Sequence, residues 1–380
     1  MALSLGNNSP RGTVGLDLDG GYLAAVSTHD GRVERAVSRE LDAGLMSDGD
    51  VVDAQGLASA VKAFFRDEKL PRKVRLGVAN QQIAVRQLEL PKIADEAELA
   101  SAVRFQAADA IAMPLDEAAL DFQVVDEVTS PEGVTKMRLV VVAARNEMIA
   151  RLTAAIRDAG LKAEGIDLDA FALVRALAPP TDPTGAARVY CHLGGVTNLA
   201  VAIGPTCLFT RTLRAVVDLD APTVASAPPA REPAPAPQVM PAPAPGPATT
   251  PTPAPDANPD PEAAAVEAAA LAAIEAADEK PEPAPTAPTQ ARDPQIAALS
   301  EEIRLSIDYY MAQPDAREAT QLTLSGPGSQ REDIAAALGD ALGLPVEVAV
   351  PLGGLDVSSV AAGEDPYRYT IAAGLALGGE

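Results

Sequence analysis

Two stretches, Val14–Tyr22 (VGLDLDGGY) and Val189–Thr197 (VYCHLGGVT), decide the fold of this chain. Each reads as an apolar strand, a tight glycine turn and the start of a second strand. Glycine lets the backbone approach an anion closely, and successive N–H groups in such a turn can hold a phosphate. The two stretches therefore predict a pair of phosphate hairpins, one in each half of the chain.

A third glycine turn follows in Leu322–Gly328 (LTLSGPG), where it would meet the nucleoside. Two facing hairpins and a later turn are the layout of an actin-like nucleotide clamp, although each turn alone is also typical of a plain loop. The predicted nucleotide-binding residues are Asp17, Asp19, Gly20, Gly21, Tyr22, Gly194, Gly195, Thr197, Gly326, Pro327 and Gly328. Asp17 is also the predicted ligand of Mg²⁺, because this ion prefers hard oxygen ligands.

Strand patterns repeat on both sides of the middle of the chain. Residues 13–18, 21–27 and 32–38 predict one three-strand meander, and 188–193, 198–203 and 207–213 predict another. Predicted helices follow each meander; in one of them, residues 53–67, Leu57, Val61 and Phe64 share a face. The pattern predicts an α/β fold with two duplicated, ribonuclease H-like domains.

Charge and composition exclude several classes of function. The net charge of −23 disfavours binding to nucleic-acid phosphates or to anionic lipid. No run reaches the roughly 20 apolar residues that span a bilayer, and residues 1–12 have no apolar signal core. Two cysteines without metal-ligand spacing predict buried thiols in a reducing compartment. We therefore expect a cytoplasmic protein without direct membrane insertion.

Residues 222–294 hold most of the chain's 34 prolines, in Pro-Ala and Pro-Thr repeats. Such sequence buries too little apolar surface to offset the entropy of ordering it. It predicts a disordered, polyproline-like linker, interrupted by an alanine-rich island over 262–280.

Several runs resemble the PilM family of type IV pilus biogenesis proteins, relatives of the division protein FtsA. They are residues 103–106 (VRFQ) with 113–117 (MPLDE) and 120–124 (LDFQV), then 140–145 (VVVAAR) with 166–173 (IDLDAFAL), and 302–310 (EIRLSIDYY). The resemblance covers about 12–215 and 297–378. It implies an actin-like fold that binds ATP and Mg between its halves and lies at the inner membrane. It also implies that a groove between subdomains 1A and 1C binds the N-terminal tail of the membrane protein PilN. Other pilus assembly proteins are further partners that the resemblance implies.

The resemblance implies a division of the chain into subdomains. After a disordered N-terminus (1–12), subdomain 1A would comprise 13–81 and 159–180, with 1C inserted at 82–158. Subdomain 2A would comprise 186–221 and 295–368, separated by the linker, and a C-terminal helix at 369–380 would return to 1A. Arg104 is the residue expected to contact the partner, although a surface ion pair is the ordinary role of such an arginine.

Three departures from the family pattern bear on nucleotide chemistry. His192 stands where the family has an aspartate, and a neutral imidazole is a poor substitute for an acid that organises Mg²⁺ and water. Pro327 removes one N–H donor from the third turn. The proline tract takes the place of subdomain 2B, which closes over the nucleotide.

The sequence thus predicts a PilM-like adaptor, an ATP-binding or degenerate scaffold with little or no ATPase activity. Two alternatives stay open: an active Mg-dependent ATPase of the actin, Hsp70 and sugar-kinase superfamily, and an FtsA-like division scaffold. An aspartate at position 192 would have favoured turnover, and a 2B subdomain would have favoured a filament.

Overall fold

The structure is a computed structural model that describes residues 13–29, 32–129, 135–181, 184–213, 293–313, 316–331, 333–349, 352 and 365–378. The predicted N-terminal tail and linker residues 222–292, including the alanine-rich island, lie outside these ranges. Within them, no helix has the length and apolar character needed to cross a membrane.

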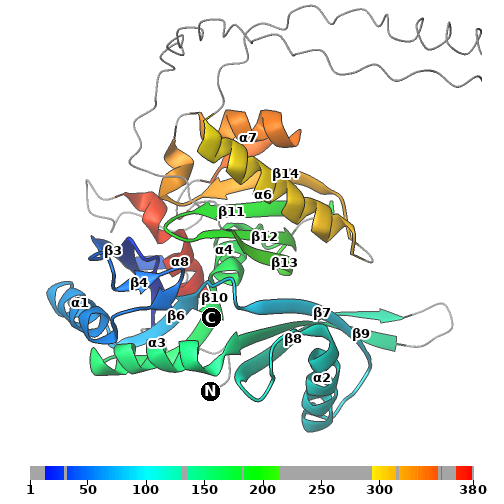
Figure 1. Ribbon diagram of the computed structural model, residues 1–380, viewed down its shortest axis with the longest axis horizontal. Helices are drawn as coiled ribbons and strands as arrows, with labels where there is room; N and C mark the ends of the chain where they lie inside the picture. The colour runs from blue at the N-terminus through cyan, green and yellow to red at the C-terminus, as the bar shows by residue number, and fades with distance from the viewer. Residues whose placement is uncertain are drawn as a thin grey trace, which may run out of the picture. The chain divides into compact units, whose positions relative to one another are not determined.

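The first predicted meander is confirmed and forms part of a five-stranded sheet in the order β10-β6-β1-β2-β3 (Figure 1). Strand β1 is antiparallel to β2 and parallel to β6, which in turn pairs in parallel with β10. The strands are β1 (Thr13–Leu18), β2 (Tyr22–His29), β3 (Arg32–Glu40), β6 (Lys73–Val78) and β10 (Lys162–Leu168).

Two amphipathic helices, α1 (Ala54–Asp67) and α3 (Asn146–Asp158), cover one face of this sheet and contact each other. The predicted apolar face of α1, which includes Leu57, Val61 and Phe64, is fully buried there. Asp53 caps α1, since its carboxylate accepts hydrogen bonds from the first-turn amides.

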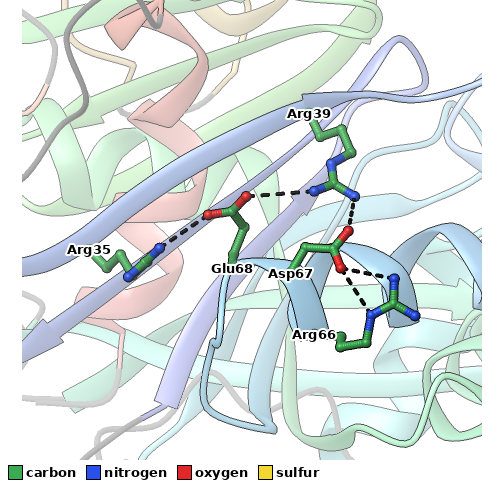
Figure 2. A network of polar contacts seen from close by, with 5 residues as sticks. All are labelled: Arg35, Arg39, Arg66, Asp67 and Glu68. Carbon is green, nitrogen blue, oxygen red and sulfur yellow. Dashed lines mark hydrogen bonds and ion pairs between the residues drawn. The ribbon is translucent and has the colours of Figure 1, made fainter.

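An exposed ion-pair network fixes the end of α1 to β3, as Figure 2 shows. Arg35 lies 3.1 Å from Glu68, and Arg39 lies 3.2 Å from Asp67 and 3.6 Å from Glu68. Hydrogen bonds from Arg66 and Arg39 lower the pKa of Asp67. Because exposed pairs are screened by solvent, the network orients α1 more than it stabilises the fold.

The second half repeats the arrangement with a sheet in the order β13-β12-β11-β14-β15. Its strands are β11 (Ala187–Leu193), β12 (Thr197–Ile203), β13 (Thr206–Leu213), β14 (Ala319–Ser325) and β15 (Val346–Val348). Helices α6 (Pro294–Met311) and α7 (Ile334–Leu342) pack with it in one apolar core. The predicted duplication of an α/β unit is confirmed.

Two short helices, α4 (Asp169–Leu177) and α8 (Thr370–Leu377), pack against each other and against both sheets (Figure 1). Their contact is so close that a Cβ atom on Gly374 would overlap the backbone of Ala172. A Cβ atom on Gly15 of β1 would likewise overlap the backbone of Ala372 in α8. Glycine at these positions lets the helical layer touch backbone directly.

A three-stranded sheet, in the order β7-β9-β8, is inserted into the first half. Strands β7 (Ala84–Pro91), β8 (Ala118–Thr129) and β9 (Thr135–Arg145) form with helix α2 (Glu96–Ala110) a separate apolar core. Strand β7 lies at the edge of this sheet and contacts β13, the edge strand of the second-half sheet.

Two local features of the structure are not predicted from the sequence. The third glycine turn continues as a 3₁₀ helix, η1 (Pro327–Gln330), before α7 begins at Ile334. A small hairpin, β4 (Met46–Ser47) and β5 (Asp50–Val51), was not predicted. Its turn has positive φ at Asp48 and Gly49, a geometry for which an Asp-Gly pair is a strong sequence signal.

The substitution Gly374→Ala should destabilise the protein by about 1–3 kcal/mol, because the added methyl group would push α8 away from the backbone of α4. Gly339→Ala in α7 is the matched control, since its Cβ would meet atoms at ordinary contact distances of 3.5 and 3.6 Å. Urea unfolding of both variants measures the difference. Equal stability of the two variants would contradict the close packing of α4 and α8.

Candidate functional site

The two predicted phosphate hairpins meet each other directly. The turn between β1 and β2 places the Asp19 carboxylate on the turn between β11 and β12. The amide of Gly195 donates to Asp19 Oδ2 at 2.5 Å, and that of Val196 donates to Oδ1 at 3.0 Å. The sequence predicts that the hairpins face each other, but not that a carboxylate joins them.

Little space is left between these turns. Cβ atoms on Gly194 or Gly195 would overlap Asp19, so both glycines are needed for this approach. The cavity beside Asp19 and Val196 has a volume of about 10 Å³. This is about the space of one water molecule, and a phosphate group does not fit in it.

A second buried carboxylate, Asp169 at the start of α4, lies beside Asp17. Asp17 follows Leu16 on β1, and Leu16 pairs with Leu76 of the neighbouring strand β6. Gly77 follows Leu76 on β6. The Asp169 carboxylate occupies the space that a side chain at position 77 would fill. The missing side chain at position 77 thus makes room for an acid at the bottom of the cleft.

These carboxylates are buried without an arginine of their own. Burial, followed by the charges of Asp169 and Asp19, raises the pKa of Asp17 well above its ordinary value. Burial likewise raises the pKa of Asp169, with smaller effects from Asp19 and Asp167. The nearby Arg175 pairs instead with Asp167 at 2.8 Å. Within the described part of the chain, Asp17 Oδ2 and Asp169 Oδ1 have no hydrogen-bond partner.

Asp19 differs from the other two acids because it accepts hydrogen bonds from the second hairpin. Burial raises its pKa to about 6, against the opposing effect of the amides of Gly195 and Val196. At neutral pH the group is therefore mostly ionised, and its charge is held by two backbone donors.

His192 is buried on β11 and is neutral at neutral pH, because burial lowers its pKa to about 4. Its Nδ1 atom lies 3.0 Å from the Ser325 hydroxyl, on the neighbouring strand β14. Its Nε2 atom has no hydrogen-bond partner among the described residues. An uncharged ring in this position does not neutralise a phosphate and is a poor ligand for Mg²⁺.

The third turn approaches the second hairpin from the side of β14. Gly326 has φ of +86°, and a Cβ atom there would also overlap the backbone of Leu193. The hydroxyl and amide of Ser329 both donate to the Gly326 carbonyl, at 2.7 and 3.0 Å. Pro327 and Gly328 belong to η1, where Gly328 is buried.

The remaining predicted residues have different surroundings. Tyr22 is buried against α8, and the guanidinium of Arg368 lies 5.1 Å from its ring centre. Thr197 is buried, whereas Gly21 is exposed and Gly20 has φ of +87°. The structure therefore brings Asp17, Asp19, Gly194 and Gly195 together, and places Tyr22 in the core beside them.

The lining of the site suits Mg²⁺ and phosphate only in part. The partnerless oxygens of Asp17 and Asp169 are ligands that suit Mg²⁺, an ion that usually takes one or two carboxylates and completes its shell with water and phosphate. The described residues contain no cluster of three or more His, Cys, Asp or Glu side chains placed to hold a metal ion. The backbone amides of Gly195 and Val196, which would hold a phosphate, are occupied by Asp19. The arrangement fits a metal–phosphate group only after Asp19 has left these donors.

A large cavity of about 850 Å³ lies where the inserted sheet meets the rest of the described fold. It is lined by Val78, Ala79, Asn80, Leu168 and Ala170 of the first half, by residues 81–86 and 111–113 around the insertion, and by Asn198, 209–212, Glu302 and Tyr309 of the second half. The cavity thus lies beside the inserted sheet and also reaches the second half.

Arg104, the predicted partner contact, does not line this cavity. It lies on α2, where it donates to the Leu115 carbonyl at 3.1 Å and lies 3.9 Å from Asp116. Its side chain is 53% exposed, so the guanidinium fixes the loop after α2 while part of it faces solvent.

No prediction from the sequence includes Asp169 in the site. An aspartate between apolar residues at a strand-to-helix junction is nevertheless a usable signal. Its position over Gly77 depends on the pairing of β6 with β10, which joins distant parts of the chain.

Asp17→Asn should make stability less dependent on pH. When the pKa of a carboxyl is raised in the folded protein, the carboxyl keeps its proton at pH values at which the unfolded chain has lost it. The pKa of Asp17 is raised in this way. For its neighbour Asp19, the pH range in which this happens runs from 3.8 to about 6. The free energy of unfolding therefore falls as pH rises, with a limiting slope of about 1.4 kcal/mol per pH unit for each such proton. Urea unfolding between pH 4.5 and 7.5 should give a shallower fall for the variant.

The exposed Asp109 provides the control, since Asp109→Asn should leave the slope unchanged. An unchanged slope in Asp17→Asn as well would show that Asp17 titrates normally in the folded protein.

Comparisons with known proteins agree with the resemblance found in the sequence. Residues 22–183 match the family model of the type IV pilus assembly protein PilM. The solved PilM–PilN type IV pilus biogenesis complex has a chain similar over 98% of this chain and 100% of its own, with a TM-score of 0.67 and 22% identity. Ethanolamine utilization protein EutJ from Carboxydothermus hydrogenoformans is similar over 98% and 92%, with a TM-score of 0.46 and 12% identity.

At 22% identity, the likeness to the solved PilM structure supports the fold, and the family-model match over residues 22–183 supports the kind of protein. Together they show that this chain has an actin-like fold and that residues 22–183 are similar to the type IV pilus assembly protein PilM.

Proposed function

We propose that this chain is a cytoplasmic adaptor that holds the N-terminal tail of a PilN-like protein of the inner membrane. The cavity of about 850 Å³ carries the proposal, because it is large and lies against the inserted sheet. The similar solved structure is a complex of PilM with PilN, which supports the identity of the partner. Localisation at the membrane would follow from the partner.

The edge strands beside the cavity suit an extended peptide. Among the described strands, β7 pairs only with β9 and β13 pairs only with β12, so each has one edge without a strand neighbour. Unpaired backbone groups at such edges can hydrogen-bond to an added strand. The side-chain amide of Gln87 on β7 donates to the Leu208 carbonyl at 2.6 Å, so this carbonyl on β13 accepts a hydrogen bond from outside its own sheet.

Polar and apolar groups both line the cavity. Gln82 and Thr212 provide polar groups, whereas Ile83 and Phe209 provide apolar surface. A peptide tail with apolar side chains on one side and polar groups on the other would fit such a lining.

Ala112→Arg should weaken binding of the tail about tenfold or more, because a long charged side chain would enter the cavity that Ala112 lines. Ala108→Arg is the matched control, since Ala108 is exposed near the end of α2 and does not line the cavity. The measurement is fluorescence anisotropy with labelled synthetic tails from PilN-like proteins encoded beside this one.

Absence of binding by every tail to the unmodified protein would contradict the adaptor role. Equal affinity of the two variants would instead place the tail outside this cavity.

We further propose that ATP and Mg, where they bind, are held at the Asp17–Asp169 end of the cleft without efficient turnover. Asp17 and Asp169 would hold the metal, the amides of Gly195 and Val196 would hold phosphate, and Gly326 would lie beside the nucleoside. A bound Mg²⁺ would neutralise phosphate charge. The neutral, buried His192 would not orient an attacking water as an acid does.

Purified protein with ATP and Mg²⁺ should therefore release phosphate no faster than the same mixture with EDTA. Steady release that is lost in Asp17→Asn would favour the alternative of an active Mg-dependent ATPase. Calorimetry on the same sample separates a protein that binds ATP without hydrolysis from one that does not bind it.

A further inference from the structure

The contact between Asp19 and the second hairpin has the geometry of an anion bound to a built site. Two successive backbone amides, those of Gly195 and Val196, each donate to one oxygen of the same carboxylate. Successive amides of this kind form anion-binding concavities, and hydrogen bonds to an ionised acceptor are about twice as strong as neutral ones. The anion here is a side chain from the other half of the chain.

The surroundings of the carboxylate fit it closely. Asp19 is 6% exposed, and the glycines of the second turn leave space for its oxygens and backbone that any Cβ atom would fill. Next to it, the cavity of about 10 Å³ admits no further group of the size of a phosphate.

The charged groups around Asp19 come from several elements. Asp17 lies near the end of β1, two residues before Asp19, and Asp169 lies at the start of α4; the charge of Asp19 raises the pKa of both carboxyls. Tyr22 at the start of β2 and the positive charge of Arg368 in η2 (Pro366–Tyr369) lower the pKa of Asp19. The two backbone amides of the second hairpin lower it more than Tyr22 and Arg368 do, so they are the main donors to the ionised carboxylate.

We infer that Asp19 is an internal latch: its carboxylate occupies the anion-binding turn of the second half, fastens the two hairpins together, and must leave before any phosphate-bearing ligand can use the same amides. Bound phosphate and a closed latch exclude each other, so each weakens the other to the same extent. The inference stands on contacts within this chain and does not rest on the adaptor role.

The test compares Asp19→Ala with the unmodified full chain by amide hydrogen exchange, followed by mass spectrometry of peptides that span residues 193–198. The Gly195 and Val196 amides should exchange about tenfold faster or more in the variant, because they lose a charged acceptor. Asp109→Ala, on the exposed face of α2, should exchange as the unmodified protein does.

Inorganic pyrophosphate is then added as the probe. It should restore protection of this segment in Asp19→Ala at concentrations that leave the unmodified protein unchanged, because only the variant offers free donors. If Asp19→Ala does not fold, as judged by circular dichroism, Asp19→Asn replaces it, because this substitution keeps the side-chain volume and removes the charge. Faster exchange and restored protection by pyrophosphate are then both expected, with smaller effects.

Exchange that is equally slow in the variant and the unmodified protein would overturn the latch. So would pyrophosphate protection at the same concentration in both. Failure of tail binding, by contrast, bears only on the proposed adaptor role.

Discussion

The close contact of α4 with α8 is the constraint on which the two-domain arrangement depends. Both helices are short and rich in small residues, and Gly374 and Gly15 let backbone meet backbone without intervening side chains. Since the two helices pack against both sheets, their separation sets how near the β1–β2 and β11–β12 turns come. Arg175 strengthens the contact, because it pairs with Asp167 and also donates to the Gly374 carbonyl at 2.8 Å.

The first turn of α4 links the cleft to the large cavity. Asp169 faces Asp17 and Gly77 in the cleft, whereas the residues on either side of it, Leu168 and Ala170, line the cavity. Val78 and Ala79 line both the small cavity beside Asp19 and the large one. The proposed nucleotide site and the proposed peptide groove thus share a wall, so a shift of this wall would change both.

The sequence was most informative where structure is local. Both meanders and the face of α1 follow from strand and helix periodicity within short windows, and the structure confirms them. The actin-like arrangement was predicted from the order of the glycine turns and from the family resemblance, since periodicity alone does not contain it.

The site could be predicted only in part, since its decisive contacts join residues far apart in the chain. Asp19 was chosen as a phosphate-binding residue, but its carboxylate bonds to amides that lie 176 and 177 residues away. Asp169 enters the site only because β10 pairs with β6, and no local pattern reports that register. Predictions that fall on residues 222–292 concern a part of the chain outside the described ranges.

The position of α8 has a consequence for the order in which the protein is made. Domains fold as the chain leaves the ribosome, amino-terminal parts first. Strand β1 is synthesised before the other described elements, yet the helix that covers its Gly15 face is synthesised after them. Strand β11 likewise lacks its parallel neighbour β14 until the long proline-rich stretch has been made. Both sheets therefore keep an uncovered face or edge until β14 and α8 emerge, so the nascent chain has reason to need protection until then.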